Sequence, residues 1–130
     1  MTRIEQLASP ARQALSLSAR RILDRIEVEI ASSAQPDVAI SFNAFEDFGV
    51  HRHAIAPALR ELAGLGFVEI NGRPAHYRLS DGWREVTTPA FARSIAVWAR
   101  LQRCPSWALR FHLIAEMQRQ QEQSTQRKRT

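Results

Sequence analysis

The stretch GVHRHAIAPALRELAGLG, residues 49–66, decides the fold of this 130-residue chain. Within it Ile55, Leu59 and Leu62 recur at i, i+4 and i+7, so their side chains share one face of a helix. The stretch therefore predicts an amphipathic helix with one buried face. The residues that this pattern directs away from that face are Arg52, His53, Ala56 and Arg60.

A shorter helix is predicted directly upstream. Asn43 followed by Glu46 has the three-residue spacing of a capping box, and Gly49 has the position of a glycine that ends a helix. A short helix, a glycine turn and a second helix form a helix-turn-helix. This part of the chain therefore predicts that motif.

Strand signals flank the motif on both sides. Downstream, residues 67–70 (FVEI) and 76–79 (HYRL) read as two strands, and Asn71-Gly72 is the strongest two-residue hairpin signal. Upstream, residues 38–42 (VAISF) are short and β-prone, and they follow a helix breaker at residues 35–37. We expect a small β-hairpin after the helix-turn-helix and a short strand before it.

Two helix starts occupy the N-terminal part. Ser9-Pro10 has the order of a cap followed by a first-turn proline, so residues 1–17 form an arm or a short helix. Ser18 can cap a longer helix with an apolar stripe at helical spacing. The stripe, which we expect in the core, consists of Ile22, Leu23, Ile26 and Ile30.

Pro57 lies inside the predicted amphipathic helix. A proline in a helix interior removes one backbone hydrogen bond and costs about 3 kcal/mol. We therefore expect the helix to start late, with Ala54 as its cap, or to bend.

The C-terminal third predicts a pair of helices over residues 81–117. Thr88-Pro89 starts the first, in which Phe91, Ile95 and Trp98 form a stripe. A second helix follows Pro105-Ser106 and is apolar nearly all round, which requires two covering surfaces. One of these could be another subunit, and packing on the N-terminal helices is the alternative. The residues predicted at a homodimer interface are Trp98, Trp107, Phe111, Leu113, Ile114 and Met117.

Composition limits the class of protein. The chain is 45% hydrophobic and carries a net charge of +5, and most of the positive charge lies in its second half. Residues 118–130 have no apolar anchor and predict a disordered basic tail, which could contact phosphates or act only as a solubilising segment. No stretch approaches the roughly 20 apolar residues of a membrane span, so we expect a soluble, cytoplasmic protein with no membrane partner. The single cysteine cannot form an internal disulfide.

The order of the predicted elements resembles the winged helix-turn-helix superfamily over residues 18–80. Within this part, residues 51–62 (HRHAIAPALREL) resemble a group of small uncharacterised winged-helix proteins of alphaproteobacteria, and more distantly MarR-type regulators and plasmid replication initiators. The resemblance implies a recognition helix in the DNA major groove and a wing on the DNA backbone. Carried over onto this sequence, the recognition helix supplies His51, Arg52, His53, Ala56 and Arg60, and the wing supplies Arg73, His76 and Arg78.

These observations predict a mainly α protein with a small β-hairpin, a winged helix-turn-helix with extra C-terminal helices. The implied function is sequence-specific binding of double-stranded DNA by a homodimer, in transcriptional regulation. The alternative is a winged helix that serves as a protein-interaction module in a replication or mobile-element assembly. The sequence contains no glycine-rich phosphate loop, no His-Glu-x-x-His and no Gly-x-Ser-x-Gly, so we expect no enzyme activity, no metal and no cofactor.

Overall fold

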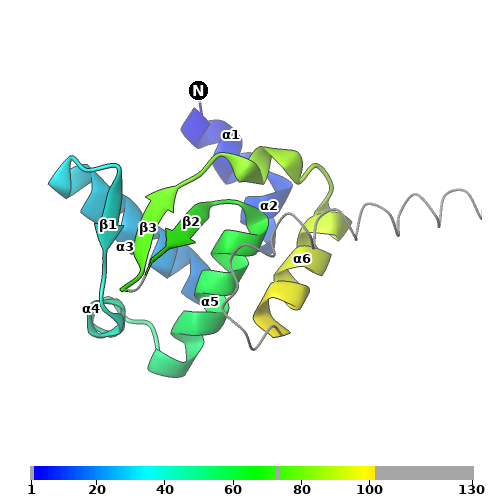
Figure 1. Ribbon diagram of the computed structural model, residues 1–130. Coiled ribbons are helices and arrows are strands. Elements are labelled where there is room, and N and C mark those ends of the chain that lie inside the picture. The colour runs from blue at the N-terminus through cyan, green and yellow to red at the C-terminus, as the bar shows by residue number, and fades with distance from the viewer. Residues whose placement is uncertain (1, 73, 102–130) are drawn as a thin grey trace, which may run out of the picture.

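The computed structural model describes residues 2–72 and 74–101 (Figure 1). The predicted class, mainly α with a small β element, is confirmed, because helices dominate and the strands form one three-stranded antiparallel sheet. The elements in chain order are α1 (Thr2–Ala8), α2 (Pro10–Ala14), α3 (Leu17–Ser33), β1 (Asp37–Ala39), α4 (Phe42–Asp47), α5 (Arg52–Leu65), β2 (Val68–Asn71), β3 (His76–Leu79), the short 3-10 helix η1 (Gly82–Glu85) and α6 (Pro89–Leu101).

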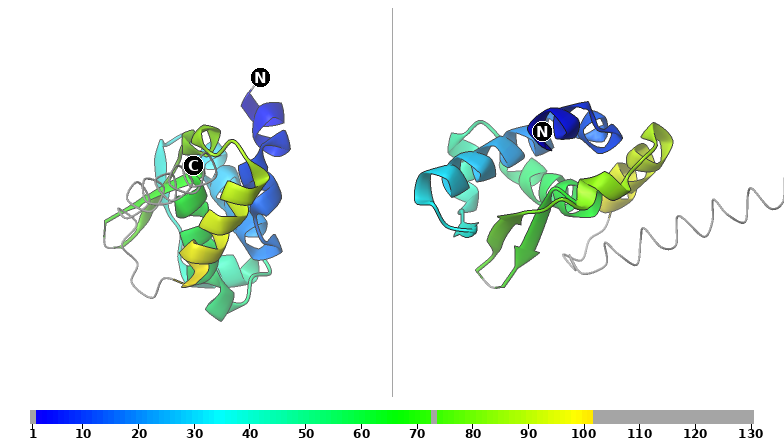
Figure 2. Two further views of the ribbon diagram at one scale, coloured as in Figure 1. Left: turned by 90° about the vertical axis from the view of Figure 1, so that its right-hand side faces the viewer. Right: turned by 90° about the horizontal axis from the view of Figure 1, so that it is seen from above.

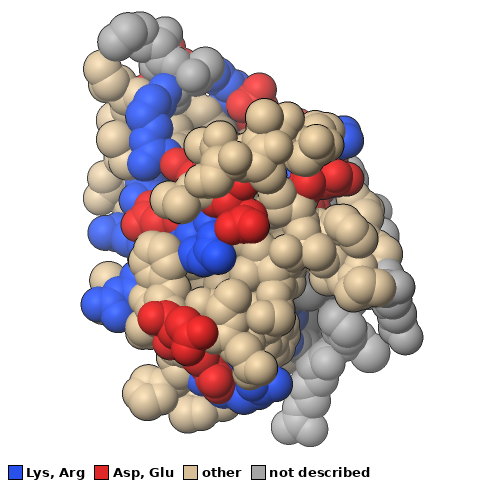
Figure 3. Space-filling model, turned by 90° about the vertical axis from the view of Figure 1, so that its left-hand side faces the viewer, with Lys and Arg blue, Asp and Glu red and all other residues tan. Residues whose placement is uncertain are grey.

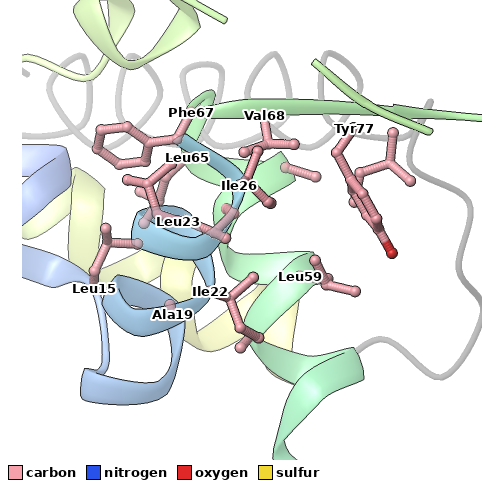
Figure 4. Packing of buried hydrophobic residues seen from close by; sticks show 14 of the residues in the cluster. Leu15, Ala19, Ile22, Leu23, Ile26, Leu59, Leu65, Phe67, Val68 and Tyr77 are labelled. Carbon is pink, nitrogen blue, oxygen red and sulfur yellow. The ribbon is translucent and has the colours of Figure 1, made fainter. Parts of the chain in front are cut away.

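The core lies between α3, α5 and the sheet. On α3, three residues of the predicted stripe, Ile22, Leu23 and Ile26, are fully buried, and the fourth, Ile30, is half-buried against the core. Figure 4 shows these side chains together with Leu59 of α5 and Tyr77 of β3. Fully burying a side chain of this size stabilises the fold by about 1.5 to 3 kcal/mol, so this contact holds the two longest helices together.

A buried carboxylate sets the start of α3. Glu61 of α5 is 1% exposed, and it accepts hydrogen bonds from the Ser16 backbone N–H at 3.0 Å and from the Ser16 hydroxyl at 2.8 Å. The same hydroxyl accepts a hydrogen bond from the Ala19 N–H, which makes Ser16 the N-cap. The cap predicted at Ser18 is therefore wrong, because a partner 45 residues away fixes the helix start.

Helices α4 and α5 follow each other across a short connection, but α4 starts earlier than predicted. Ser41 is its N-cap and accepts a hydrogen bond from the Ala44 N–H at 3.2 Å, so the predicted capping box of Asn43 and Glu46 is wrong. The predicted glycine stop is confirmed, because Gly49 has a φ of +97°, in the left-handed region that favours glycine.

Pro57 does not delay the start of α5. The helix begins at Arg52 with His51 as its N-cap, so the predicted late start with Ala54 as cap is wrong. The proline nitrogen has no hydrogen to donate to the carbonyl of His53, four residues earlier. The loss is tolerated because Ile55 and the other apolar residues of the helix are buried in the core on both sides of Pro57.

The sheet has the strand order β1-β3-β2, and the β2–β3 hairpin projects from the helices (Figure 2). Asn71 pairs with His76, so the loop spans residues 72–75 and the predicted two-residue turn at Asn71-Gly72 is wrong. A two-residue turn would place Pro74 inside the central strand, where it could not donate a ladder hydrogen bond. The loop therefore includes Pro74.

The N-terminal helices and α6 close the same core. Ala11 of α2 is fully buried, and Phe91 and Ile95 of α6 are nearly so. The start of α6 after Thr88 is confirmed, since the Thr88 hydroxyl accepts a hydrogen bond from the Phe91 N–H at 3.2 Å. Figure 1 shows α6 beside α5 at the edge of the domain.

Several predicted features lie outside the described residues. These are the wing residue Arg73, the second C-terminal helix with Trp107, Phe111, Leu113, Ile114 and Met117, and the tail of residues 118–130. Among the helices within residues 2–72 and 74–101, none is long and apolar enough to cross a lipid bilayer.

Candidate nucleic-acid interface

The first turn of α5 is exposed. His51, Arg52 and His53 are all exposed, and the rings of the two histidines stack with their centroids 5.6 Å apart. Ala56 is half-buried and lies three residues beyond His53, so the two are neighbours along the helix. The structure therefore brings four of the predicted site residues together at one end of one helix.

Arg52 is held in place by α4. Its Nη1 donates to the Oδ1 of Asn43 at 2.7 Å and lies 3.7 Å from the Oε1 of Glu46, and its guanidinium carbon is 6.0 Å from the centre of the Phe42 ring. More than half of the Arg52 side chain stays exposed. Asn43 and Glu46 are site residues that sequence reasoning missed. Their three-residue spacing on α4 is the signal in the sequence, but it predicts a helix cap and not a contact with Arg52.

A shallow hollow of about 350 Å³ lies where α4 meets α5, lined by Glu46, Gly49, Val50, His51 and Arg52. No side chain caps the start of α5, and the first N–H groups of a helix lack partners within the helix. These backbone donors, the helix dipole and Arg52 all favour an anion at this end of α5. The carboxylate of Glu46 opposes them and lowers the net positive charge of the hollow.

Arg60 does not belong to this group. Its Nε donates to the carbonyl of Ala99 at 3.0 Å, and its Nη2 donates to the carbonyl of Arg100 at 3.1 Å. A guanidinium at the last carbonyls of a helix is a favourable C-terminal partner. The side chain of Arg60 therefore anchors α6 to α5, and the outward face of α5 stays open only near its start.

The predicted wing residues on β3 lie on the solvent side of the sheet. His76 and Arg78 are exposed, whereas Tyr77 between them is buried. In the strand register Arg78 lies between two exposed carboxylates, Asp37 of β1 and Glu69 of β2. Opposite charges at directly paired positions attract across a sheet. Arg78 therefore presents a partly compensated charge to any phosphate.

Positive and negative side chains are mixed on one face of the domain. Figure 3 shows blue and red groups side by side on the face that carries the ends of α3 and α4. Counted over residues 2–72 and 74–101, the chain has 11 arginines and 11 acidic residues, so the described fold is neutral overall. The candidate interface therefore has donors in place but no strong positive field of its own.

Metal-ligating residues do not cluster in the part of the chain that the structure describes. Within that part, no group of three or more histidine, cysteine, aspartate or glutamate side chains could hold a metal ion.

Comparisons with family models, with curated proteins and with solved structures find no match to this chain. Its function must therefore be inferred from its own residues and topology.

Proposed function

We propose that this chain is a winged helix-turn-helix protein that binds double-stranded DNA sequence-specifically and regulates transcription. The observation that carries the proposal is the order of its elements. The segment from α3 to β3 runs helix, strand, helix, turn, helix and hairpin, with β3 paired to both other strands. Four residues, 48–51, connect α4 and α5, as in a helix-turn-helix. The projecting β2–β3 hairpin corresponds to the wing.

The roles of the exposed residues follow from this arrangement. In a helix-turn-helix, the N-terminal residues of the second helix reach base edges in the major groove. Arg52 and His53 supply donors there, and Ala56 is small enough to contact a thymine methyl group. We leave Arg60 out of the interface, because its guanidinium is bonded to the carbonyls at the end of α6.

The wing would contact the DNA backbone and position the protein. Arg73, His76 and Arg78 are the residues proposed for phosphate contacts, which fix orientation without reading sequence. The exposure of His76 and Arg78 supports this role.

Selection of tight-binding duplexes from a random pool tests the proposal, followed by anisotropy titrations of variants. Arg52→Ala is expected to weaken binding to the selected site by about 1 to 3 kcal/mol and to relax its preference. Arg78→Ala is expected to weaken binding to all duplexes alike. Arg93→Ala, an exposed change on α6, is the control and leaves binding unchanged. A pool that shows no enrichment at low salt contradicts the proposal.

We further propose that the chain acts as a homodimer. Trp98, the one predicted interface residue that the structure describes, is 42% exposed on α6. Its neighbour Val97 and Leu101, three residues further on, are also exposed. A two-fold dimer can address two DNA half-sites about 34 Å apart. The exposed apolar surface at the end of α6 supports this assembly.

The neutral charge of the described fold favours a second candidate, a winged helix that binds another protein in a replication or mobile-element assembly. A fold with as many acidic as basic residues has no net electrostatic attraction to a polyanion such as DNA. Absence of duplex binding at low salt, together with a folded chain, is the result that this candidate predicts.

A further inference from the structure

The guanidinium of Arg52 has one occupied side and one open side. Its Nη1 donates to the Oδ1 of Asn43 at 2.7 Å and lies 3.7 Å from the Oε1 of Glu46, so both polar partners lie at the same nitrogen. Within residues 2–72 and 74–101, no hydrogen bond engages its Nε or Nη2. The side chain is 59% exposed, so a ligand can reach this guanidinium.

The partners that hold Arg52 all belong to one short helix, α4. Besides Asn43 and Glu46, the Phe42 ring contributes, because its centre lies 6.0 Å from the guanidinium carbon, a distance at which a cation and an aromatic ring attract. The helix itself is fixed in the core by Phe45, which is fully buried. A side chain that is already held in place loses less conformational freedom when it binds a ligand. Arg52 is therefore preorganised.

The open side of Arg52 carries two parallel N–H donors, on Nε and Nη2. Such a pair matches a ligand with two acceptors side by side, which can be a carboxylate, a phosphate or the O6 and N7 atoms of guanine. Charge distinguishes among these ligands. The Glu46 carboxylate beside Nη1 repels an anion, but it acts much less on a neutral base. Adenine offers only one acceptor and one donor at this edge, so one donor of Arg52 would stay unpaired.

We propose that the Nε and Nη2 edge of Arg52 is a guanine-binding site, which takes the O6 and N7 atoms of a guanine in the DNA major groove. Asn43 is the positioning residue, because its bond to Nη1 directs the open edge away from α4. The inference rests on the proposed function and deepens it, since it names the base at one position of the DNA site. The phosphates are left to other donors, among them the first backbone N–H groups of α5.

The first test separates the geometry of Arg52 from its charge. Duplexes are selected from a random pool with the full wild-type chain and with Arg52→Lys, which keeps the charge and loses the paired donors. The wild-type selection is expected to contain a guanine that the Arg52→Lys selection lacks. Replacing this guanine with 7-deazaguanine removes the N7 acceptor. In anisotropy titrations, this replacement is expected to weaken wild-type binding about tenfold and to leave Arg52→Lys binding unchanged.

The second test concerns Asn43, which is exposed, so that its replacement leaves the core intact. Asn43→Ala removes the acceptor for Nη1, and the preference for guanine over the other bases is expected to fall at least about threefold. Asn43→Asp keeps an acceptor there, and it is expected to retain the preference while its added charge weakens binding to all duplexes alike. Asp47→Ala, an exposed change on the same helix, is the control and leaves the preference unchanged.

The outcomes separate this inference from the proposed function. If wild type and Arg52→Lys select the same bases, or 7-deazaguanine binds as tightly as guanine, the guanine site is overturned and sequence-specific binding stands. A uniform loss of affinity in Arg52→Lys makes Arg52 a phosphate contact and also overturns the guanine site. A wild-type preference retained in Asn43→Ala overturns the positioning role. A wild-type selection without any enrichment contradicts the proposed function itself.

Discussion

Tyr77 on the central strand joins the sheet to the helices. Its side chain is 2% exposed, and its ring meets the buried Phe45 ring of α4 edge to face, with centroids 5.9 Å apart. Such aromatic pairs stabilise a fold by about 0.5 to 1.5 kcal/mol beyond the area that they bury. Tyr77 therefore connects the hairpin to α4.

Burial of Tyr77 predicts a loss of stability at alkaline pH. Desolvation raises the pKa of its phenol above the ordinary value of 10.0. Above about pH 10 the unfolded chain loses this proton while the folded chain keeps it, so the free energy of unfolding falls as pH rises. Below about pH 10 the tyrosine is protonated in both states, and its stabilising contribution to the free energy of unfolding is fully present.

Tyr77 is the only tyrosine, so ultraviolet absorbance of the tyrosinate follows it directly. We expect its titration in the folded protein to occur at higher pH than in denaturant. We also expect denaturant unfolding of Tyr77→Phe to depend less on pH above 10. The same titration curve in both states contradicts this assignment.

Two arginines on α5 show what the sequence could predict at single positions and what it could not. Helical spacing placed Arg52 and Arg60 away from the buried stripe, and neither is buried. Helical spacing cannot show which of the two guanidinium groups is free to bind a ligand. The difference lies in their partners, because Arg52 donates to Asn43 of α4 and Arg60 donates to a carbonyl at the end of α6. Partners distant in sequence decide which guanidinium remains available.

At the scale of elements, α5 and α6 pack closely because small residues face each other. A Cβ added at Gly64 would lie 3.2 Å from the Cβ of Ala99 and 3.4 Å from the Cγ2 of Ile95. Gly64, Ala99 and Ile95 therefore bury one face of α6 against α5. The opposite side leaves Trp98 exposed.

Because one face of α6 is buried on α5 and Trp98 lies on the exposed face, we expect Trp98→Glu to dissociate the proposed dimer without unfolding the chain. A charge placed in an apolar interface is costly to desolvate, but a charge at an exposed position of the monomer is not. Sedimentation equilibrium at micromolar concentration is expected to give a dimer mass for the wild type and a monomer mass for the variant.

Ser32→Glu is the matched control, because it adds the same charge at an exposed position of another helix, α3. It is expected to leave the dimer mass and the melting temperature unchanged. A monomeric wild type, or a Trp98→Glu chain that unfolds, contradicts the dimer surface on α6.

The elements were predictable where their signals are local. Apolar spacing gave the stripe of α3, and the cap-then-proline order gave the starts of α2 and α6. The starts of α3 and α4 were misplaced by two residues or less, and α5 starts before the predicted cap. The misplacement at α3 has a clear cause, because Glu61 fixes Ser16 through a contact that no local pattern contains.

At the scale of the whole molecule, charge and topology point to different parts of the chain. Segment charges indicated that the positive field belongs to the second half of the sequence. The positive charge of that half lies partly within and partly beyond the described residues. Residues 84–101 carry three arginines and one glutamate, and residues 102–130 carry a net charge of +4.

Amide chemical-shift mapping by NMR tests the central claim most directly. The labelled full chain is titrated with a selected duplex at about 150 mM salt, where contacts without sequence preference are weakened. The account predicts the largest shifts at residues 51–56 of α5 and at residues 72–78 of the hairpin, with α1 and η1 unaffected. Shifts confined to residues 102–130, or centred on α1 and η1, would contradict a winged-helix mode of DNA binding.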